Sequence, residues 1–111
     1  RFEAGIKLFN SCQWYQSHDI FEEIWHETGG PERQILQGIL QVAVAQVHLE
    51  NGNKNGATIL YGEALGRLKR SQLDNLGLDI VGLCKCINKR LEFLQMGKDL
   101  SACSLPVLCV L

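Results

Sequence analysis

The feature that most constrains this fold is the stretch 31–50, which is apolar around most of a helical circumference. Aliphatic side chains recur along it at helical spacing from Ile35 to Leu49. Gly30 precedes it and Pro31 begins it, and a glycine cap followed by a proline in the first turn is typical of a helix boundary. A helix that is apolar on most sides is buried by its neighbours, so this stretch is predicted to be the central helix of an all-α protein.

Four further stretches show helical periodicity, and no alternating run suggests a sheet. The connection at Gly52 and Asn53 is so short that the third and fourth helices must be antiparallel. We therefore expect an all-α, compact bundle of about five helices with a central antiparallel helical hairpin. The expected helices cover residues 2–11, 14–28, 31–50, 54–70 and about 80–97, with a loop around 73–77.

The chain of 111 residues has the size of one domain. A domain of this size buries roughly two-thirds of the surface of its unfolded chain, so it needs neither metal nor disulfide to fold. We place the helical domain at residues 1–97 and a C-terminal tail at residues 98–111. The tail is mostly aliphatic, contains Pro106 and lacks a helical pattern, so it either packs on the body or docks elsewhere.

Charge and hydropathy argue against two classes of partner. Eleven basic and twelve acidic side chains give a formal net charge of −1, so we expect no nucleic-acid partner unless a local basic patch binds it. No run of about 18 apolar residues exists, so no membrane span is expected. Two short basic clusters, more typical of solvated helix faces, are Arg67, Lys69 and Arg70, and Lys85, Lys89 and Arg90.

The five cysteines are an odd number without framework spacing, so we expect free thiols and a soluble protein in a reducing compartment. Cys84 and Cys86 resemble a chelating pair. On a helix, residues two positions apart point about 200° apart, so these two thiols cannot share a metal ion.

The second expected helix carries a candidate for metal chemistry. His18 and Glu22 are four residues apart, so their side chains can hydrogen-bond or contribute two ligands to one metal ion. A third and a fourth ligand would be needed, and Glu22 or Glu23 could then act as general base for a metal-bound water. The candidates that the sequence leaves open for these ligands are His48, His26, Glu23, Asp19 and the thiols. The aromatic side chains Trp14, Phe21 and Trp25 share one arc of this helix.

Two polar stripes run along the stretch 31–50, and both cannot be the solvent face of a small bundle. We expect the first stripe to face a polar pocket or a partner. Set against the second helix, its Gln37 and Gln41 would satisfy His18 and Glu22 in a network that fixes helix register without catalysis. The first stripe consists of Gln34, Gln37, Gln41 and His48, and the second of Glu32, Gln46 and Glu50.

Three glycines lie inside expected helices, where each costs about 1 kcal/mol relative to alanine. We interpret Gly38, Gly62 and Gly66 as packing notches that allow close helix approach.

The string His18-Asp19-Ile20-Phe21-Glu22-Glu23-Ile24-Trp25, followed by Gly30-Pro31-Glu32-Arg33 and Leu36-Gln37-Gly38, resembles the domain of unknown function 309 family. The resemblance covers about the first 70 residues. It implies an all-helical fold and a signature at His18, Glu22 and Trp25, for which metal binding has been suggested. The family's members have no established activity. Ser11-Cys12-Gln13 stands where the family usually has a small residue and glycine, so this junction is expected to be angled differently.

Two functions follow as hypotheses, and whether the protein is an enzyme stays open. The first is a non-catalytic protein-interaction or structural module that binds a protein partner through residues 98–111 or its helix surfaces, without a cofactor. The alternative is a metal-binding protein or metal-assisted hydrolase that holds a divalent metal at His18 and Glu22. Since related sequences occur in photosynthetic lineages, the expected compartment is the cytoplasm or the plastid stroma. The candidate site residues are His18, Glu22, Trp25, Gln37, Gln41 and His48.

Overall fold

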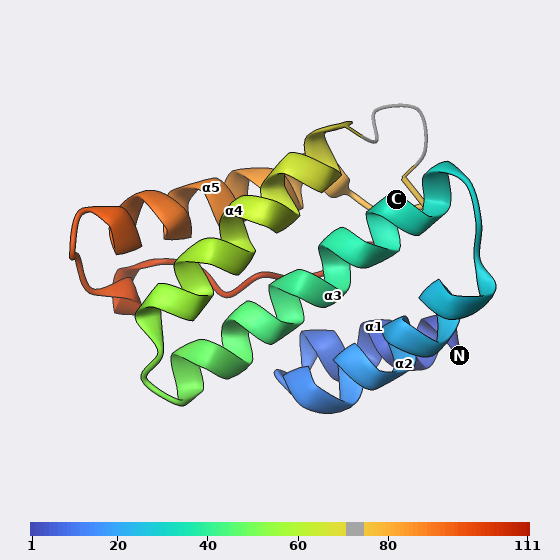
Figure 1. Cartoon of the computed structure of the whole chain (residues 1–111), viewed down its shortest axis with the longest axis horizontal. Helices are drawn as coiled ribbons and strands as arrows, with labels where there is room; N and C mark the ends of the chain where they lie inside the picture. Colours follow the sequence, from blue (N-terminus) through green and yellow to red (C-terminus); the bar gives the residue numbers. More distant parts are fainter. Residues whose placement is uncertain (71–74) are drawn as a thin grey trace.

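The computed structural model describes residues 1–70 and 75–111, which form five α-helices and one short 3-10 helix (Figure 1). The predicted all-α bundle is confirmed. Most helix ends lie within one residue of the predicted positions, although the fifth helix ends at Gln95 rather than near residue 97. Residues 73 and 74 of the expected loop lie outside the described residues. The helices are α1 (Phe2–Asn10), α2 (Trp14–Glu27), α3 (Pro31–Glu50), α4 (Lys54–Arg70), α5 (Ile80–Gln95) and η1 (Leu100–Ala102).

The central position of α3 is confirmed. It packs against α2 on one side and against α4 on the other, while α1 covers α2 and α5 covers α4 (Figure 1). Its side chains Ile35, Ile39 and Val42 are fully buried. Within the described part of the chain, α3 and the other helices all fall short of the length and apolar character that a membrane crossing requires.

Asn53 closes the α3–α4 hairpin. Its side-chain Oδ1 accepts a hydrogen bond from the Gly56 backbone N–H at 2.9 Å, which caps the start of α4. Its Nδ2 lies 3.2 Å from His48 Nδ1 at the end of α3. A Cβ at position 56 would lie 2.6 Å from Asn53 Nδ2, so only glycine leaves room for this arrangement. His48 thus has a structural partner within its own hairpin.

The interpretation of the helical glycines is confirmed at one position and wrong at two. A Cβ on Gly38 would lie 2.8 Å from the Leu68 side chain, so this glycine allows α3 and α4 to approach closely. Gly62 has no neighbour within 4 Å of such a Cβ, and Gly66 meets only Arg70 of its own helix. Both lie on sides of α4 that face no other helix closely. The periodicity of α4 did not show which glycines face α3.

The α1–α2 junction adopts a glycine-like backbone without a glycine. Cys12 has a φ of +63°, in the left-handed region that glycine adopts most easily. The turn thus has the backbone conformation of a glycine turn, and its difference in angle from the family's usual junction stays a prediction. Just beyond it, Ser17 Oγ donates a hydrogen bond of 3.1 Å to the Gly5 carbonyl, which holds α2 close against α1.

The C-terminal tail packs on the body, crossing behind α3 and α4 in Figure 1. Asn10 donates to the Leu108 carbonyl at 2.9 Å and accepts from the Leu108 N–H at 2.8 Å. Farther along, Leu78 and Val110 form an antiparallel bridge. Pro106 and Leu108 are buried. The tail therefore joins the end of α1 to the residues just before α5.

Candidate functional site

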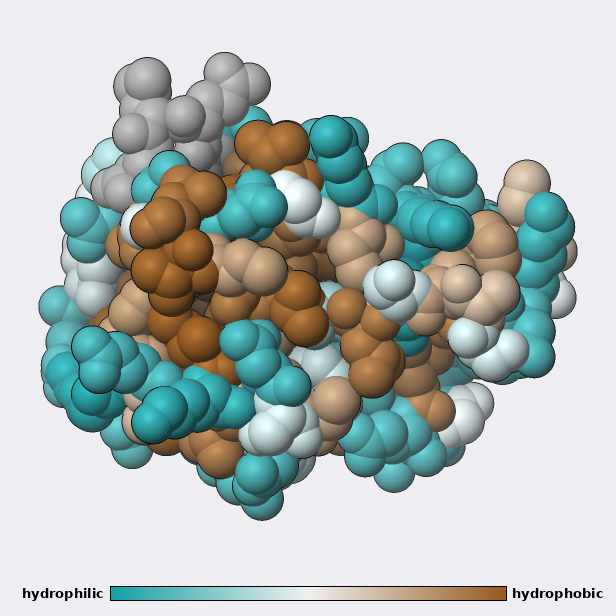
Figure 2. Space-filling model, turned by 180° about the vertical axis from the view of Figure 1, so that it is seen from behind, coloured by the Kyte–Doolittle hydropathy of each residue, from teal (hydrophilic) through white to brown (hydrophobic). Residues whose placement is uncertain are grey.

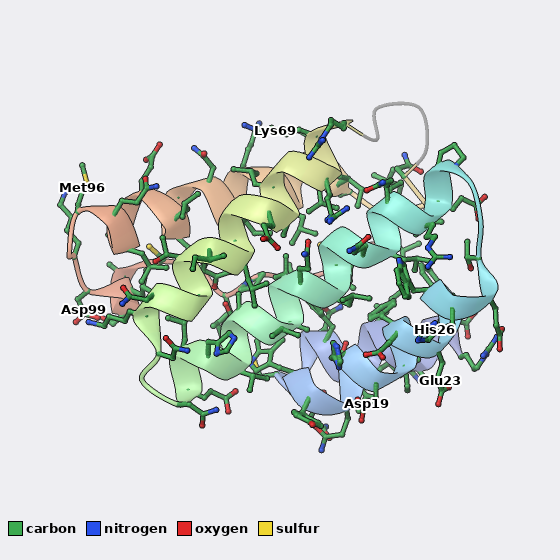
Figure 3. All side chains as sticks on the ribbon, in the orientation of Figure 1. Asp19, Glu23, His26, Lys69, Met96 and Asp99 are labelled. Atoms are coloured by element: carbon green, nitrogen blue, oxygen red, sulfur yellow. The ribbon has the colours of Figure 1, made fainter. Side chains whose placement is uncertain are left out.

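His18 and Glu22 form the pair that their spacing allows. His18 Nε2 lies 3.0 Å from Glu22 Oε2, and His18 Nδ1 lies 3.3 Å from Asp19 Oδ1. The other Glu22 oxygen lies 3.6 Å from His26 Nε2. The His18 side chain is 22% exposed, so this cluster lies at the surface of α2. Figure 3 shows Asp19, Glu23 and His26 along the outer side of that helix.

The surroundings of this pair limit its capacity for metal. In residues 1–70 and 75–111, no three His, Cys, Asp or Glu side chains are grouped so that they could hold a metal ion. His18 and Glu22 are therefore a two-ligand arrangement within the described part of the chain. Two protein ligands leave most of a metal ion's coordination to water or substrate.

Trp25 differs from the other two aromatic residues of its predicted arc. Trp14 and Phe21 are buried in the core, whereas Trp25 is half-buried. The Arg33 guanidinium lies 3.8 Å from the Trp25 ring centroid, a cation–π contact that joins α2 to α3. The buried Nε1 of Trp25 has no hydrogen-bond partner among the described residues. Trp25 thus fastens the α2–α3 connection.

The predicted network of α3 glutamines with His18 and Glu22 is wrong at Gln41. Gln41 Nε2 donates instead to Glu63 Oε2 on α4 at 2.9 Å, and Arg67 of α4 donates to Gln34 Oε1 at 3.0 Å. The stripe fails to reach α2 because it lies on the side of α3 that meets α4. The candidate residues thus fall into two groups, one on α2 and the other between α3 and α4. Gln37, which belongs to the same stripe of α3 as Gln34 and Gln41, is half-buried.

A buried hydrogen-bond network, which the sequence patterns did not predict, lies between three helices. The Tyr61 hydroxyl donates to Gln46 Oε1 and accepts a bond of 2.9 Å from Arg90 Nε, so the network links α3, α4 and α5. Arg90 also donates to the Ser104 carbonyl at 3.0 Å, which fastens the tail. Arg90 is only 4% exposed, so the prediction that it lies on a solvated helix face with Lys85 and Lys89 is wrong. Burial raises the pKa of the Tyr61 hydroxyl, which stays protonated and donates.

One feature of the sequence could have predicted this hydrogen-bond network. Arg90 lies three residues after Ile87 and four before Leu94, so it falls on the apolar stripe of α5. A charged residue on a buried stripe needs polar partners in the core. Gln46 was assigned to the second stripe of α3, which was not expected to be the buried one, yet it is among the most buried polar residues.

An open groove of about 770 Å³ lies between the end of α4, the start of α5 and the end of the tail. We call it the C-terminal groove. Its walls are mainly aliphatic, and Lys69, on α4, and Lys85, on α5, line it together with Asp79. The Asp79 carboxylate accepts a bond of 2.9 Å from the Gly82 N–H and caps α5. The aliphatic lining residues are Leu68, Leu78, Ile80, Val81 and Leu111.

Exposed aliphatic side chains border this groove. Val81 is 68% exposed and Leu111 is 75% exposed. Most of the exposed large hydrophobic residues in the described part of the chain belong to the tail or to the first turn of α5. Figure 2 shows hydrophobic side chains gathered on the face seen from behind, with hydrophilic ones around them.

All five cysteines are free, as predicted. Cys84 lines the C-terminal groove, and burial raises the pKa of its thiol. Cys86 lies on another side of α5, where its Sγ approaches the Ser104 carbonyl at 3.5 Å, and burial raises its pKa as well. Thiols held in the protonated form are poor nucleophiles.

The fold and these surfaces define a small all-helical domain with a surface His–Glu pair and a separate apolar groove. The family model described as domain of unknown function (DUF309) matches residues 2–60, and the chain belongs to this family. The match includes His18, Glu22 and Trp25 but ends before the residues that line the C-terminal groove. No curated protein matches the chain.

Proposed function

We propose that this protein is a non-catalytic module that binds a partner protein in the C-terminal groove. The observation that carries the proposal is the groove itself, an open aliphatic surface bordered by the exposed side chains of Val81 and Leu111. Contiguous exposed apolar surface of this kind marks interaction sites.

The chemistry of the lining supports binding rather than catalysis. Asp79 is committed to the cap of α5, and the Cys84 thiol is held protonated by burial. The remaining charged lining residues, Lys69 and Lys85, are exposed on the groove walls. A protonated thiol and two exposed amines do not form an activated nucleophile with its base.

The residues that line the groove lie outside the part of the chain that matches the family model. The lining begins at Leu68, after the family match has ended at residue 60. The family match covers α1, α2, α3 and the start of α4, whereas the groove is lined by the end of α4, the start of α5 with the residues just before it, and the end of the tail. The proposed binding therefore does not depend on the His18–Glu22 pair.

Site-specific photocrosslinking tests this function. Val81 is replaced by a benzophenone amino acid in the full chain in its own cell, and Tyr15, 65% exposed on α2, serves as the control position. We expect one partner protein to crosslink from position 81 and none from position 15. The purified partner should bind the purified chain, and Leu111→Asp should weaken that binding without changing the far-ultraviolet circular dichroism.

Equal crosslinking from both positions would reject the groove as the binding surface. So would a purified partner that binds wild type and Leu111→Asp with the same affinity. Because Leu111 is exposed at the groove border, its substitution should leave the core intact.

A second candidate function is metal binding at His18 and Glu22, with metal-assisted hydrolysis as its extension. The distance of 3.0 Å between His18 Nε2 and Glu22 Oε2 supports it, because one metal ion could replace the shared proton. Equilibrium dialysis of the tag-free chain against Zn²⁺ tests it. Near-equimolar metal that is lost in His18→Ala but kept in His48→Ala would support metal binding at this pair, and metal-free wild type would reject it.

A further inference from the structure

We infer that the segment bound in the C-terminal groove is an acidic amphipathic helix of the partner protein. This inference rests on the proposed function and specifies the chemistry of its partner. Three observations lead to it: the groove is open, its walls offer few main-chain hydrogen bonds, and its lining has two lysines against one carboxylate, that of Asp79.

The open shape favours a macromolecule over a small ligand. Small-molecule sites usually enclose most of their ligand's surface. Here Val81 and Leu111 remain largely exposed at the border of the groove, where a bound small molecule would leave them in water. A partner segment that lies along the groove would cover them.

The walls favour a helix over an extended peptide. An extended segment gains affinity from main-chain hydrogen bonds with a free strand edge. Beside the groove, the Asp79 N–H donates to the Cys109 carbonyl at 2.8 Å, and the Leu111 N–H donates to the Gly77 carbonyl at 2.9 Å. Most of the other lining residues lie on α4 and α5, and Asn75 and Leu78 lie just before α5. A helix satisfies its own backbone and needs only such side-chain contacts.

The charge around the groove favours carboxylates on that helix. Lys69 lies on one wall and Lys85 on the other. The charge of Lys69 acts on the Cys84 thiol in the lining and opposes the rise in its pKa. Lys69 lies far from the acidic outer side of α2 that carries Asp19 and Glu23 (Figure 3). Complementary charges steer association and fix the orientation of a partner.

Nucleic acid fits this surface less well. Its phosphates would meet the two lysines, but the wall between them is aliphatic and offers no aromatic side chain for base stacking. A helix with aliphatic residues on one side and glutamates beside them matches both features. Lys69 and Lys85 would meet the glutamates, and the exposed side chains of Val81 and Leu111 would meet the aliphatic side.

The test uses two designed peptides of about 16 residues, roughly four helical turns. Both have leucines at helical spacing; one carries glutamates at the remaining positions and the other lysines. Binding to the reduced full chain is measured by fluorescence anisotropy. The rate of Cys84 alkylation, followed by mass spectrometry, locates the binding, and Cys86 on another side of α5 is the internal control.

We expect the acidic peptide to bind and to slow alkylation of Cys84 but not of Cys86. Lys69→Glu with Lys85→Glu should weaken its binding about tenfold or more and allow the basic peptide to bind instead. The matched control, Lys7→Glu with Lys98→Glu, changes two exposed lysines outside the groove lining and should leave the affinity unchanged.

Three results would overturn the inference: preferential binding of the basic peptide to wild type, binding of the acidic peptide without protection of Cys84, or protection of Cys84 by an oligonucleotide. The crosslinking experiment separates the two proposals. A partner that crosslinks at position 81 through a basic or extended segment leaves the proposed function standing and rejects the acidic helix. Absence of any crosslinked partner rejects the function itself.

Discussion

The turn between α1 and α2 holds Cys12 in a backbone conformation that is strained for a residue with a side chain. Cys12 has a side chain but a φ of +63°, and a left-handed conformation costs a residue with a Cβ about 1–2 kcal/mol. Glycine avoids this cost. We therefore predict that Cys12→Gly stabilises the protein by about 1 kcal/mol, measured as a higher urea midpoint with an unchanged slope.

Ser11→Gly is the matched control for that substitution. Ser11 has a φ of −99°, and its Oγ donates to the Lys7 carbonyl at 2.8 Å. Glycine there adds freedom to the unfolded chain and removes a hydrogen bond, so a modest destabilisation is expected. If both glycine variants shifted the midpoint in the same direction, strain at Cys12 would not be the cause.

The chain of Gln46, Tyr61 and Arg90 leads to a second prediction at the residue scale. Tyr61→Phe removes the hydroxyl and leaves Gln46 Oε1 and Arg90 Nε buried without this partner. Each unsatisfied buried group costs about 1–3 kcal/mol, so we expect a loss of roughly 2–4 kcal/mol in the free energy of unfolding. Tyr15→Phe, an exposed position, should change it by less than about 0.5 kcal/mol.

A double-mutant cycle separates this network from simple packing. Arg90→Met removes the guanidinium that donates to the Tyr61 hydroxyl. The double variant, Tyr61→Phe with Arg90→Met, should therefore be at least about 1 kcal/mol more stable than the sum of the two single losses predicts. Strict additivity of the two losses would mean that Tyr61 and Arg90 contribute independently.

The sequence predicted the residue pairs within one element better than those between elements. The i, i+4 spacing of His18 and Glu22 was sufficient to predict their contact, because helix geometry alone determines it. The partner of Gln41 was not predictable in the same way. Periodicity places Gln41 on a stripe of α3, but the crossing of three helices decides whether that stripe meets α2 or Glu63 of α4.

At the scale of the element, two glycines of the α3–α4 hairpin should respond oppositely to the same substitution. A methyl group on Gly38 would lie 2.8 Å from Leu68, which is buried and has little room to move. Gly38→Ala should therefore cost about 1–3 kcal/mol. A methyl group on Gly62 meets nothing within 4 Å, so Gly62→Ala should add up to about 1 kcal/mol of stability through helix propensity.

Thermal and urea unfolding of the two variants test this pair, and each serves as the control for the other. Stabilisation by both substitutions would mean that α3 and α4 do not approach closely at Gly38. The result also bears on what sequence can predict. Both glycines lie inside predicted helices, and only their distances to a neighbouring helix distinguish them.

For the whole molecule, the helices were predictable and the path of the tail was not. Periodicity, Gly30 with Pro31, and the short turn at Asn53 specify local structure, so they determine five helices and the central hairpin. The tail is held by contacts distant in sequence, such as the bonds between Asn10 and Leu108. The aliphatic composition of the tail predicted that its side chains would be buried but did not indicate which helix they would pack against.

The tail therefore supplies the last prediction. Leu108 is 3% exposed and is held by Asn10 on α1, while the residues after it pair with the chain just before α5. Leu108→Ala should cost about 2–5 kcal/mol, whereas Leu105→Ala, half-exposed on the same tail, should cost far less. Because the tail joins the first and last helices, urea transitions followed by tryptophan fluorescence and by circular dichroism should stay coincident and shift together. An unchanged midpoint in Leu108→Ala would instead show that the tail docks as a separate unit whose packing adds nothing to the stability of the bundle.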